Sequence, residues 1–189
     1  MRDDDSPRPA TNPWRTLSSR EVYRNPWIRV REDEVLRPSG QPGIYGVVEM
    51  KIATAIVTLT EDENVVLVGQ WRYPFDEYSW EIVEGAADDG ESPRDAAARE
   101  LREEAGLGAD HWQTLGKPVA LSNSVTNEVA HIFLARGLHP LPAAPDETEL
   151  LKLRQIPLKQ AVRMATDGEI VDALSVIGLL RAARWLDQA

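Results

Sequence analysis

The chain has 189 residues, no cysteine, and 31 acidic against 21 basic side chains, which gives a formal net charge of −10. This length corresponds to one domain, or to one domain with a small appendage, and 42% apolar residues suffice for a hydrophobic core. The absence of cysteine excludes a zinc–thiolate site and a cysteine nucleophile, and the acidic balance disfavours nucleic-acid or membrane binding through a general basic surface.

Residues 1–13 contain three consecutive aspartates and three prolines with hardly any apolar side chain, so we expect a flexible tail. They lack the basic start and apolar stretch of a secretory signal. No apolar run in the chain approaches the roughly 18 residues of a membrane span. We therefore expect a cytoplasmic protein.

Two runs of β-forming residues, Trp27–Leu36 and Ile44–Met50, flank a turn segment at 38–43 that is rich in proline and glycine. They predict a β-hairpin of a small N-terminal sheet. We assign residues 14–50 to this β appendage.

Two further β-branched runs, Ala53–Leu59 and Asn64–Trp71, are separated by four polar residues and predict a second hairpin that begins the main sheet. Shorter strand candidates follow. They cover Trp80–Val83, Gln113–Leu121, Glu128–Leu134 and Leu150–Ile156.

Residues Pro93–Ala105 are almost entirely Ala, Arg, Glu and Leu, the strongest helix formers. Ser92 can cap the N-terminus, Pro93 suits the first turn, and Gly106 fits just beyond the C-terminus. This segment is therefore predicted to be a helix, and two more helical patterns cover Leu158–Thr166 and Ala173–Leu186.

Strand candidates outnumber helical ones and alternate with them irregularly, which favours an α/β fold with a mixed sheet packed by a few helices. We expect one such domain over residues 51–189, preceded by the β appendage.

Three carboxylates of the predicted helix, Glu100, Glu103 and Glu104, have the spacing i, i+3 and i+4 and so share one face. Like charges so placed repel each other, and a hard divalent cation such as Mg²⁺ or Mn²⁺ turns that repulsion into a binding site. The alternative is a solvated helix with surface pairs such as Arg99 with Glu103.

The segment before this helix favours the metal site. It contains Gly85 and Gly90, leads from a strand into the helix, and ends at another carboxylate, Glu91. A backbone turn beside a carboxylate-bearing helix face is a suitable cradle for a metal-bound diphosphate.

These residues resemble the Nudix hydrolase family. Its box reads G-x5-E-x7-R-E-U-x-E-E-x-G-U, where U is aliphatic, and the chain matches every fixed position. The matching residues are Gly85, Glu91, Arg99, Glu100, Leu101, Glu103, Glu104, Gly106 and Leu107.

The resemblance implies an α/β/α sandwich and metal-dependent hydrolysis of nucleoside diphosphate derivatives. It assigns Glu100 and Glu104 as principal metal ligands, Glu103 as a further ligand or base, and the Gly85 carbonyl as a ligand that completes the site. It also implies that Glu91 pairs with the box arginine to brace the loop against the helix.

The surrounding sequence resembles one branch, the ADP-ribose and nucleotide-sugar pyrophosphatases. The resemblance implies that Arg72 and Glu81 line the substrate cleft, although the two residues could equally form an ordinary cross-strand pair. It also implies a homodimer in which the β appendage contributes to the partner's site. The chain has Asn123 where ADP-ribose pyrophosphatases often carry a proline, which weakens ADP-ribose as the sole substrate.

The sequence leaves alternatives for the residue that acts as general base and for the residue that stacks on the nucleobase. The branch places a catalytic glutamate in an acidic loop before its last two helices, where Glu147 aligns best, against the alternative of a mobile acidic loop. Glu128 is a second candidate, against simple solvation at a strand end. Trp27 is a candidate for substrate binding by stacking on a base, against core packing.

The sequence thus predicts a Mg²⁺-dependent diphosphatase acting on a nucleotide sugar such as GDP-mannose or ADP-glucose, or on ADP-ribose. Two alternatives are a non-catalytic domain that senses nucleotide sugars and a nucleoside triphosphate pyrophosphatase.

Overall fold

The computed structural model describes residues 11–142 and 150–188, which form two compact units. The first, here called the appendage unit, comprises the described residues up to Met50 together with 122–127. The second, the main unit, comprises 51–121 and the described residues from Glu128 onward. Residues 1–10 of the predicted tail lie outside the described residues.

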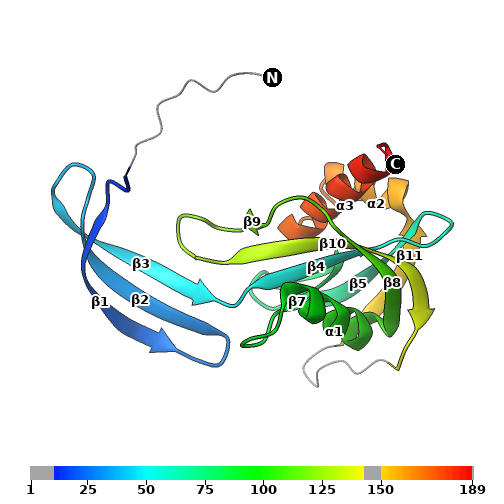
Figure 1. Ribbon diagram of the computed structural model, residues 1–189, viewed down its shortest axis with the longest axis horizontal. Coiled ribbons are helices and arrows are strands. Elements are labelled where there is room, and N and C mark those ends of the chain that lie inside the picture. Colours follow the sequence, from blue (N-terminus) through cyan, green and yellow to red (C-terminus); the bar gives the residue numbers. More distant parts are fainter. Residues whose placement is uncertain (1–10, 143–149, 189) are drawn as a thin grey trace. The chain divides into compact units, whose positions relative to one another are not determined.

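The appendage unit is built on a three-stranded antiparallel sheet in the order β1-β2-β3 (Figure 1). The predicted hairpin is confirmed as β2 (Ile28–Leu36) and β3 (Pro42–Met50). The remaining strand, β1 (Arg15–Arg24), was not predicted. All ten of its residues are exposed, so it has no buried face to leave an apolar alternation in the sequence.

The main unit contains two sheets. One has the order β7-β4-β10-β8, with β9 paired to β10, and the other has the order β11-β5-β6. Only the β4–β10 pair is parallel among the paired strands of the described residues, so the larger sheet is mixed. The strands are β4 (Ala53–Thr58), β5 (Asn64–Arg72), β6 (Glu77–Glu81), β7 (Val83–Ala86), β8 (Leu107–Thr114), β9 (Val119–Ala120), β10 (Val129–Pro140) and β11 (Lys152–Pro157).

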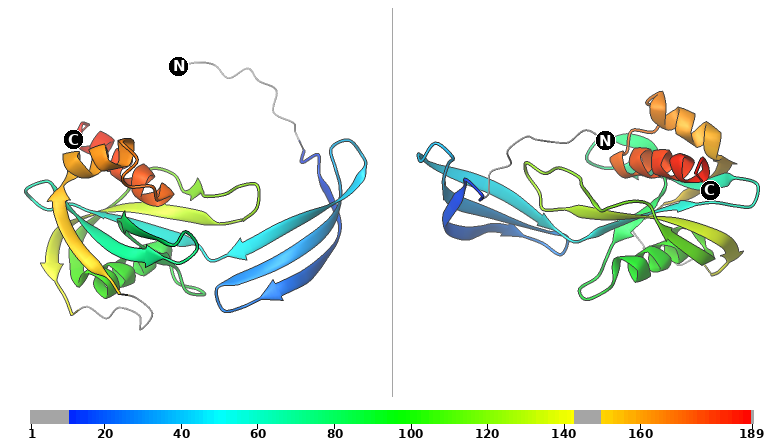
Figure 2. Two further views of the ribbon diagram at one scale, coloured as in Figure 1. Left: turned by 180° about the vertical axis from the view of Figure 1, so that it is seen from behind. Right: turned by 45° about the horizontal axis from the view of Figure 1, so that its top comes forward.

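Three helices cover these sheets: α1 (Pro93–Ala105), α2 (Leu158–Thr166) and α3 (Ala173–Leu186). Figures 1 and 2 show α1 on one side of the main-unit sheets and α2 and α3 on the other. The predicted α/β/α sandwich with a mixed sheet and a small β-sheet appendage is therefore confirmed. No helix in the described ranges is long and apolar enough to span a bilayer.

The predicted second hairpin is wrong, because β4 and β5 belong to different sheets. All six residues of β4 are buried, so both of its faces must be covered. After a tight turn, in which the Thr60 amide donates to the Asn64 carbonyl at 2.9 Å, β5 enters the second sheet.

Two segments that were each predicted as one strand are parts of two strands in the structure. The predicted strand Trp80–Val83 becomes the end of β6 and the start of β7, separated by the buried Ile82, whose amide donates to the Ser175 hydroxyl at 2.9 Å. The predicted strand Gln113–Leu121 covers only the end of β8 and the short β9.

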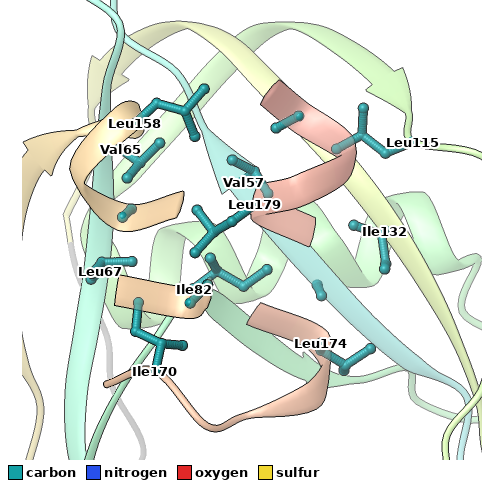
Figure 3. Packing of buried hydrophobic residues seen from close by; sticks show 14 of the residues in the cluster. Val57, Val65, Leu67, Ile82, Leu115, Ile132, Leu158, Ile170, Leu174 and Leu179 are labelled. Atoms are coloured by element: carbon teal, nitrogen blue, oxygen red, sulfur yellow. The ribbon is translucent and has the colours of Figure 1, made fainter. Parts of the chain in front are cut away.

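The larger hydrophobic core lies between the sheets and α2 and α3, where side chains such as Val57, Leu67, Ile82, Ile132 and Leu179 pack together (Figure 3). A second cluster beneath α1 contains Leu101, which is fully buried. Full burial of one leucine contributes about 1.5–3 kcal/mol. These two cores fix α1 and α3 on the sheets, and both helices contribute residues to the site described next.

Candidate active site

Helix α1 has the boundaries that the sequence predicted. The Ser92 hydroxyl accepts from the Asp95 amide at 3.1 Å, and Gly106 ends the helix with φ of 64°, a left-handed conformation that suits glycine. Ala97 and Leu101 are buried against the sheet. This packing determines which side of the helix carries the carboxylates.

Two of these carboxylates lie against strand β7. Gly85 has no room for a Cβ, because the Glu100 carboxyl group occupies that position. The Glu104 carboxylate is buried and accepts from the backbone amide of Glu84 at 3.3 Å. Glu100, Glu104 and the backbone at Gly85 are therefore brought together.

Arg99 connects the loop to the carboxylate face. Its guanidinium donates to both carboxylate oxygens of Glu91 at 3.1 and 3.0 Å, to Glu100 at 2.8 Å and to Glu103 at 2.9 Å. These hydrogen bonds, led by the Glu91 pair, raise the pKa of Arg99 above its usual range, and they lower that of Glu91. The predicted loop-to-helix brace is present.

The donor set fits a hard divalent cation. Three carboxylates and one backbone carbonyl supply the oxygen ligands that Mg²⁺ or Mn²⁺ prefers. Within residues 11–142 and 150–188, no three Asp, Glu, His or Cys side chains are already arranged to hold a metal. A bound cation would compete with Arg99 for Glu100 and Glu103, which Arg99 now holds.

A cavity of about 410 Å³ adjoins this face, a size within the range of about 300–1,000 Å³ that is usual for small-molecule sites. Its lining contains one cationic side chain, Arg72, and four acidic ones. The lining residues are Ala53, Gln70, Arg72, Glu84, Gly85, Ala86, Glu104, Leu121, Glu128, Asp172, Ala173 and Leu174.

Arg72 is held by Glu81 from the neighbouring strand. Its Nε donates to the two carboxylate oxygens of Glu81 at 2.9 and 3.0 Å, and Nη2 forms a further ion pair with the same carboxylate. Burial lowers the pKa of Arg72, but the hydrogen bonds to Glu81 together with the negative charges of Glu81, Glu84 and Asp172 outweigh that effect and raise it. The guanidinium thus stays charged at the cavity. Glu81 is itself only 2% exposed, and it lines a second cavity of about 570 Å³.

Sequence reasoning missed Glu84 and Asp172. Asp172 is the N-cap of α3, where its Oδ2 accepts from the Ser175 amide at 2.7 Å. The Ser175 hydroxyl donates to Glu84 Oε1 at 3.1 Å. Burial first, and then the Asp172 carboxylate, raise the pKa of Glu84 well above its usual range. Because Glu84 and Asp172 are far apart in the chain, the sequence gives no sign that they are neighbours; it shows only that Asp172 can cap a helix.

The three remaining candidate residues, Glu128, Trp27 and Glu147, do not lie together. Glu128 lines the first cavity, and burial raises its pKa. Trp27 lies in the appendage unit and is 74% exposed, so the alternative of core packing does not apply to it. Glu147 lies outside the described residues.

The comparisons with known proteins agree with this geometry. Residues 50–174 match the NUDIX domain, and residues 14–48 match the N-terminal domain of nucleoside diphosphate sugar hydrolases. An ADP-ribose pyrophosphatase of Mycobacterium tuberculosis is 33% identical over 174 residues, which cover 90% of this chain and 84% of that protein.

Two further proteins extend the comparison. A methanol dehydrogenase activator of Bacillus methanolicus is 29% identical over 87% of this chain and 90% of its own length. The crystal structure of an ADP compounds hydrolase superposes with a TM-score of 0.83 at 25% identity, over 96% of this chain and 98% of that one. With the NUDIX domain matched over most of the main unit, the chain belongs to the NUDIX family of hydrolases.

Proposed function

We propose that this enzyme hydrolyses the diphosphate bond of a nucleotide sugar, such as GDP-mannose or ADP-glucose, or of ADP-ribose. The products are a nucleoside monophosphate and a sugar phosphate. The observation that carries the proposal is that Glu104 of α1 and Gly85 of β7 line one cavity together with Arg72. A diphosphate needs both a metal site and a fixed cation, and these residues supply them.

In this proposal Glu100, Glu104 and the Gly85 carbonyl hold Mg²⁺ or Mn²⁺, with Glu103 as a further ligand. When bound there, the cation neutralises phosphate charge and lowers the pKa of a bound water. The four acidic side chains of the lining would otherwise repel a diphosphate.

Arg72 binds and orients the phosphate. Its hydrogen bonds to Glu81 use Nε and Nη2, which leaves the Nη1 edge of the guanidinium for a phosphate oxygen. Glu81 fixes the plane of the guanidinium, so that the phosphate does not have to order a flexible side chain on binding.

Glu103, Glu128 and Glu147 are the candidates for the general base. Glu128 gains support from its place on the cavity and from its raised pKa, because a base whose pKa is nearer neutrality transfers protons more effectively at pH 7. Replacement of each by glutamine discriminates between them: loss of the base removes the acidic limb of the pH–rate profile, whereas loss of a metal ligand raises the Mg²⁺ concentration needed for half-maximal rate.

A substrate panel tests the proposal. The protein is incubated with ADP-ribose, GDP-mannose, ADP-glucose and UDP-glucose plus Mg²⁺, and the products are followed by phosphorus NMR, with EDTA as the control. We expect a nucleoside monophosphate and a sugar phosphate from at least one compound. Binding of a nucleotide sugar without turnover would instead identify a sensor, and turnover of nucleoside triphosphates alone would identify a triphosphate pyrophosphatase.

We also propose a homodimer in which Trp27 contributes to substrate binding. The exposed indole of Trp27 supports its role in substrate binding, because an exposed ring can stack on a nucleobase. Light scattering measures the mass, and Trp27→Ala is expected to raise KM while leaving kcat nearly unchanged.

A further inference from the structure

Two carboxyl groups on the first cavity, Glu84 and Asp172, have no role in the chemistry above. They come from β7 and from the cap of α3 and are joined through the fully buried Ser175, whose amide binds Asp172 and whose hydroxyl binds Glu84. Both side chains line the first cavity. Glu84 and Asp172 are therefore held in fixed positions in the lining of the first cavity.

Their location relates them to whatever is attached to the diphosphate. Gly85 and Glu104 line only the first cavity, whereas Arg72 and Asp172 line both the first cavity and the second. A diphosphate that extends from the proposed metal ligands to Arg72 would place its substituent near Asp172, which lines both cavities. The second cavity then offers its substituent the side chains of Phe75, Tyr78, Ser79 and Val171.

The chemistry of this wall suits one kind of substituent. Carboxyl groups accept hydrogen bonds from hydroxyl groups, and the faces of Phe75 and Tyr78 can pack on the apolar faces of a sugar or a base. A third phosphate at the same place would bring its negative charge against the Asp172 carboxylate, which costs about tenfold or more in affinity.

We propose that Glu84 and Asp172 determine substrate specificity: they admit a neutral, hydroxyl-bearing sugar on the diphosphate and exclude a third phosphate. This inference rests on the proposed function, because it takes the first cavity to be the diphosphate site. It makes nucleoside triphosphates poor ligands and diphosphate-linked sugars good ones.

The test compares the binding of two analogues that cannot be cleaved at the linkage concerned, α,β-methylene ADP-ribose and α,β-methylene ATP. Dissociation constants are measured by calorimetry with Mg²⁺ for the wild-type protein and for the double variant Glu84→Gln/Asp172→Asn. These substitutions remove charge but keep shape, since glutamine still accepts from Ser175 and asparagine is as good an N-cap as aspartate. The matched control is Glu169→Gln, at an exposed position that lines neither cavity.

We expect the wild-type protein to favour the ADP-ribose analogue, and the double variant to shift the ratio of the two dissociation constants toward the ATP analogue by about tenfold or more. The control should leave the ratio unchanged. If the double variant does not fold, Asp172→Asn alone is expected to shift the ratio in the same direction.

Three results would overturn the inference: a ratio that stays within about twofold, weaker ATP-analogue binding in the variant, or no binding of either analogue to the wild-type protein. A failure of the proposed function gives a different result. Absence of hydrolysis refutes the catalytic proposal, while the selectivity in binding still decides the role of Glu84 and Asp172.

Discussion

The two sides of the first cavity are built in opposite ways. The α1 wall, which comprises Gly85 and Glu104, comes from one continuous stretch of sequence. In this stretch Arg99 binds the neighbouring Glu100 and Glu103 carboxylates and the Ala86 carbonyl. The α3 wall, which comprises Arg72, Glu84 and Asp172, comes from three elements and is held by Glu81 and Ser175. The proposed metal site is therefore local in sequence, whereas the residues proposed to select the substrate come together only through tertiary packing.

The largest effect should follow from a change in the α1 wall. Glu104→Gln removes a proposed metal ligand, and we expect kcat to fall by roughly a thousandfold, since a metal contributes several kcal/mol of transition-state stabilisation. Glutamine still accepts from the Glu84 amide, so the melting temperature should change little. Steady-state kinetics and thermal denaturation measure the two quantities, and near-normal turnover would refute the assignment.

A change in the α3 wall should separate binding from stability. Arg72→Met removes the proposed phosphate contact and leaves Glu81 as a buried carboxylate without its cation. We expect kcat/KM to fall by about a hundredfold and the free energy of unfolding by about 2 kcal/mol.

The second substitution Glu81→Gln in the same protein removes the unpaired charge, so it should restore most of the stability and none of the activity. Recovery of turnover in this double variant would show that Arg72 has only a structural role. Chemical denaturation and initial rates provide both readouts.

The close approach of β7 to α1 gives an intermediate effect. Gly85→Ala places a Cβ where the Glu100 carboxyl group now lies, so that carboxylate must move. We expect about a tenfold loss of kcat with a small change in stability, because a flexible side chain gives way. Gly46→Ala is the matched control, since no atom lies within 4 Å of its added Cβ. Equal activities of the two variants would contradict the proposed geometry.

The smallest effect concerns the brace of the α1 wall. Since Arg99 lowers the folded-state pKa of Glu91, this carboxylate stabilises the fold above its unfolded-state pKa of about 4.3, and the contribution is lost as the pH falls through the folded-state value. Glu91→Gln should therefore cost about 1 kcal/mol at pH 7 and less at pH 3. Urea unfolding at both values measures this, and an equal cost at both would refute the ion-pair explanation.

Much of the α1 wall could be predicted from the sequence, because helical spacing and capping residues fix which side chains share a face. Helix α1 has the predicted boundaries, and Glu100 and Glu104 meet β7. The pairing of strands could not be predicted so well. All residues of β4 are buried, but their sequence does not show which strand will pair with them, so the predicted pairing with β5 is wrong.

The α3 wall shows a second limit. Asp172 carries the signal of a helix cap, which explains its contact with Ser175 but not its place beside Glu84, 88 positions earlier in the chain. That proximity depends on how α3 packs on the sheet, a property of the core rather than of either local sequence. The predicted roles of Glu103, Glu128 and Trp27 stay predictions.

The small sheet of the appendage unit has a consequence for solution behaviour. Among its described residues only Asp33 and Val35 are buried, and its strands are connected by ion pairs such as Arg20 with Glu32 and Arg29 with Glu49. Exposed ion pairs weaken as salt shortens the Debye length to about 8 Å at physiological ionic strength, whereas apolar packing does not. Backbone amides in β1–β3 should thus exchange their hydrogens faster as sodium chloride is added, whereas the exchange of the main-core amides should stay unchanged. One chain then contains a segment whose stability depends on ionic strength and another whose stability does not.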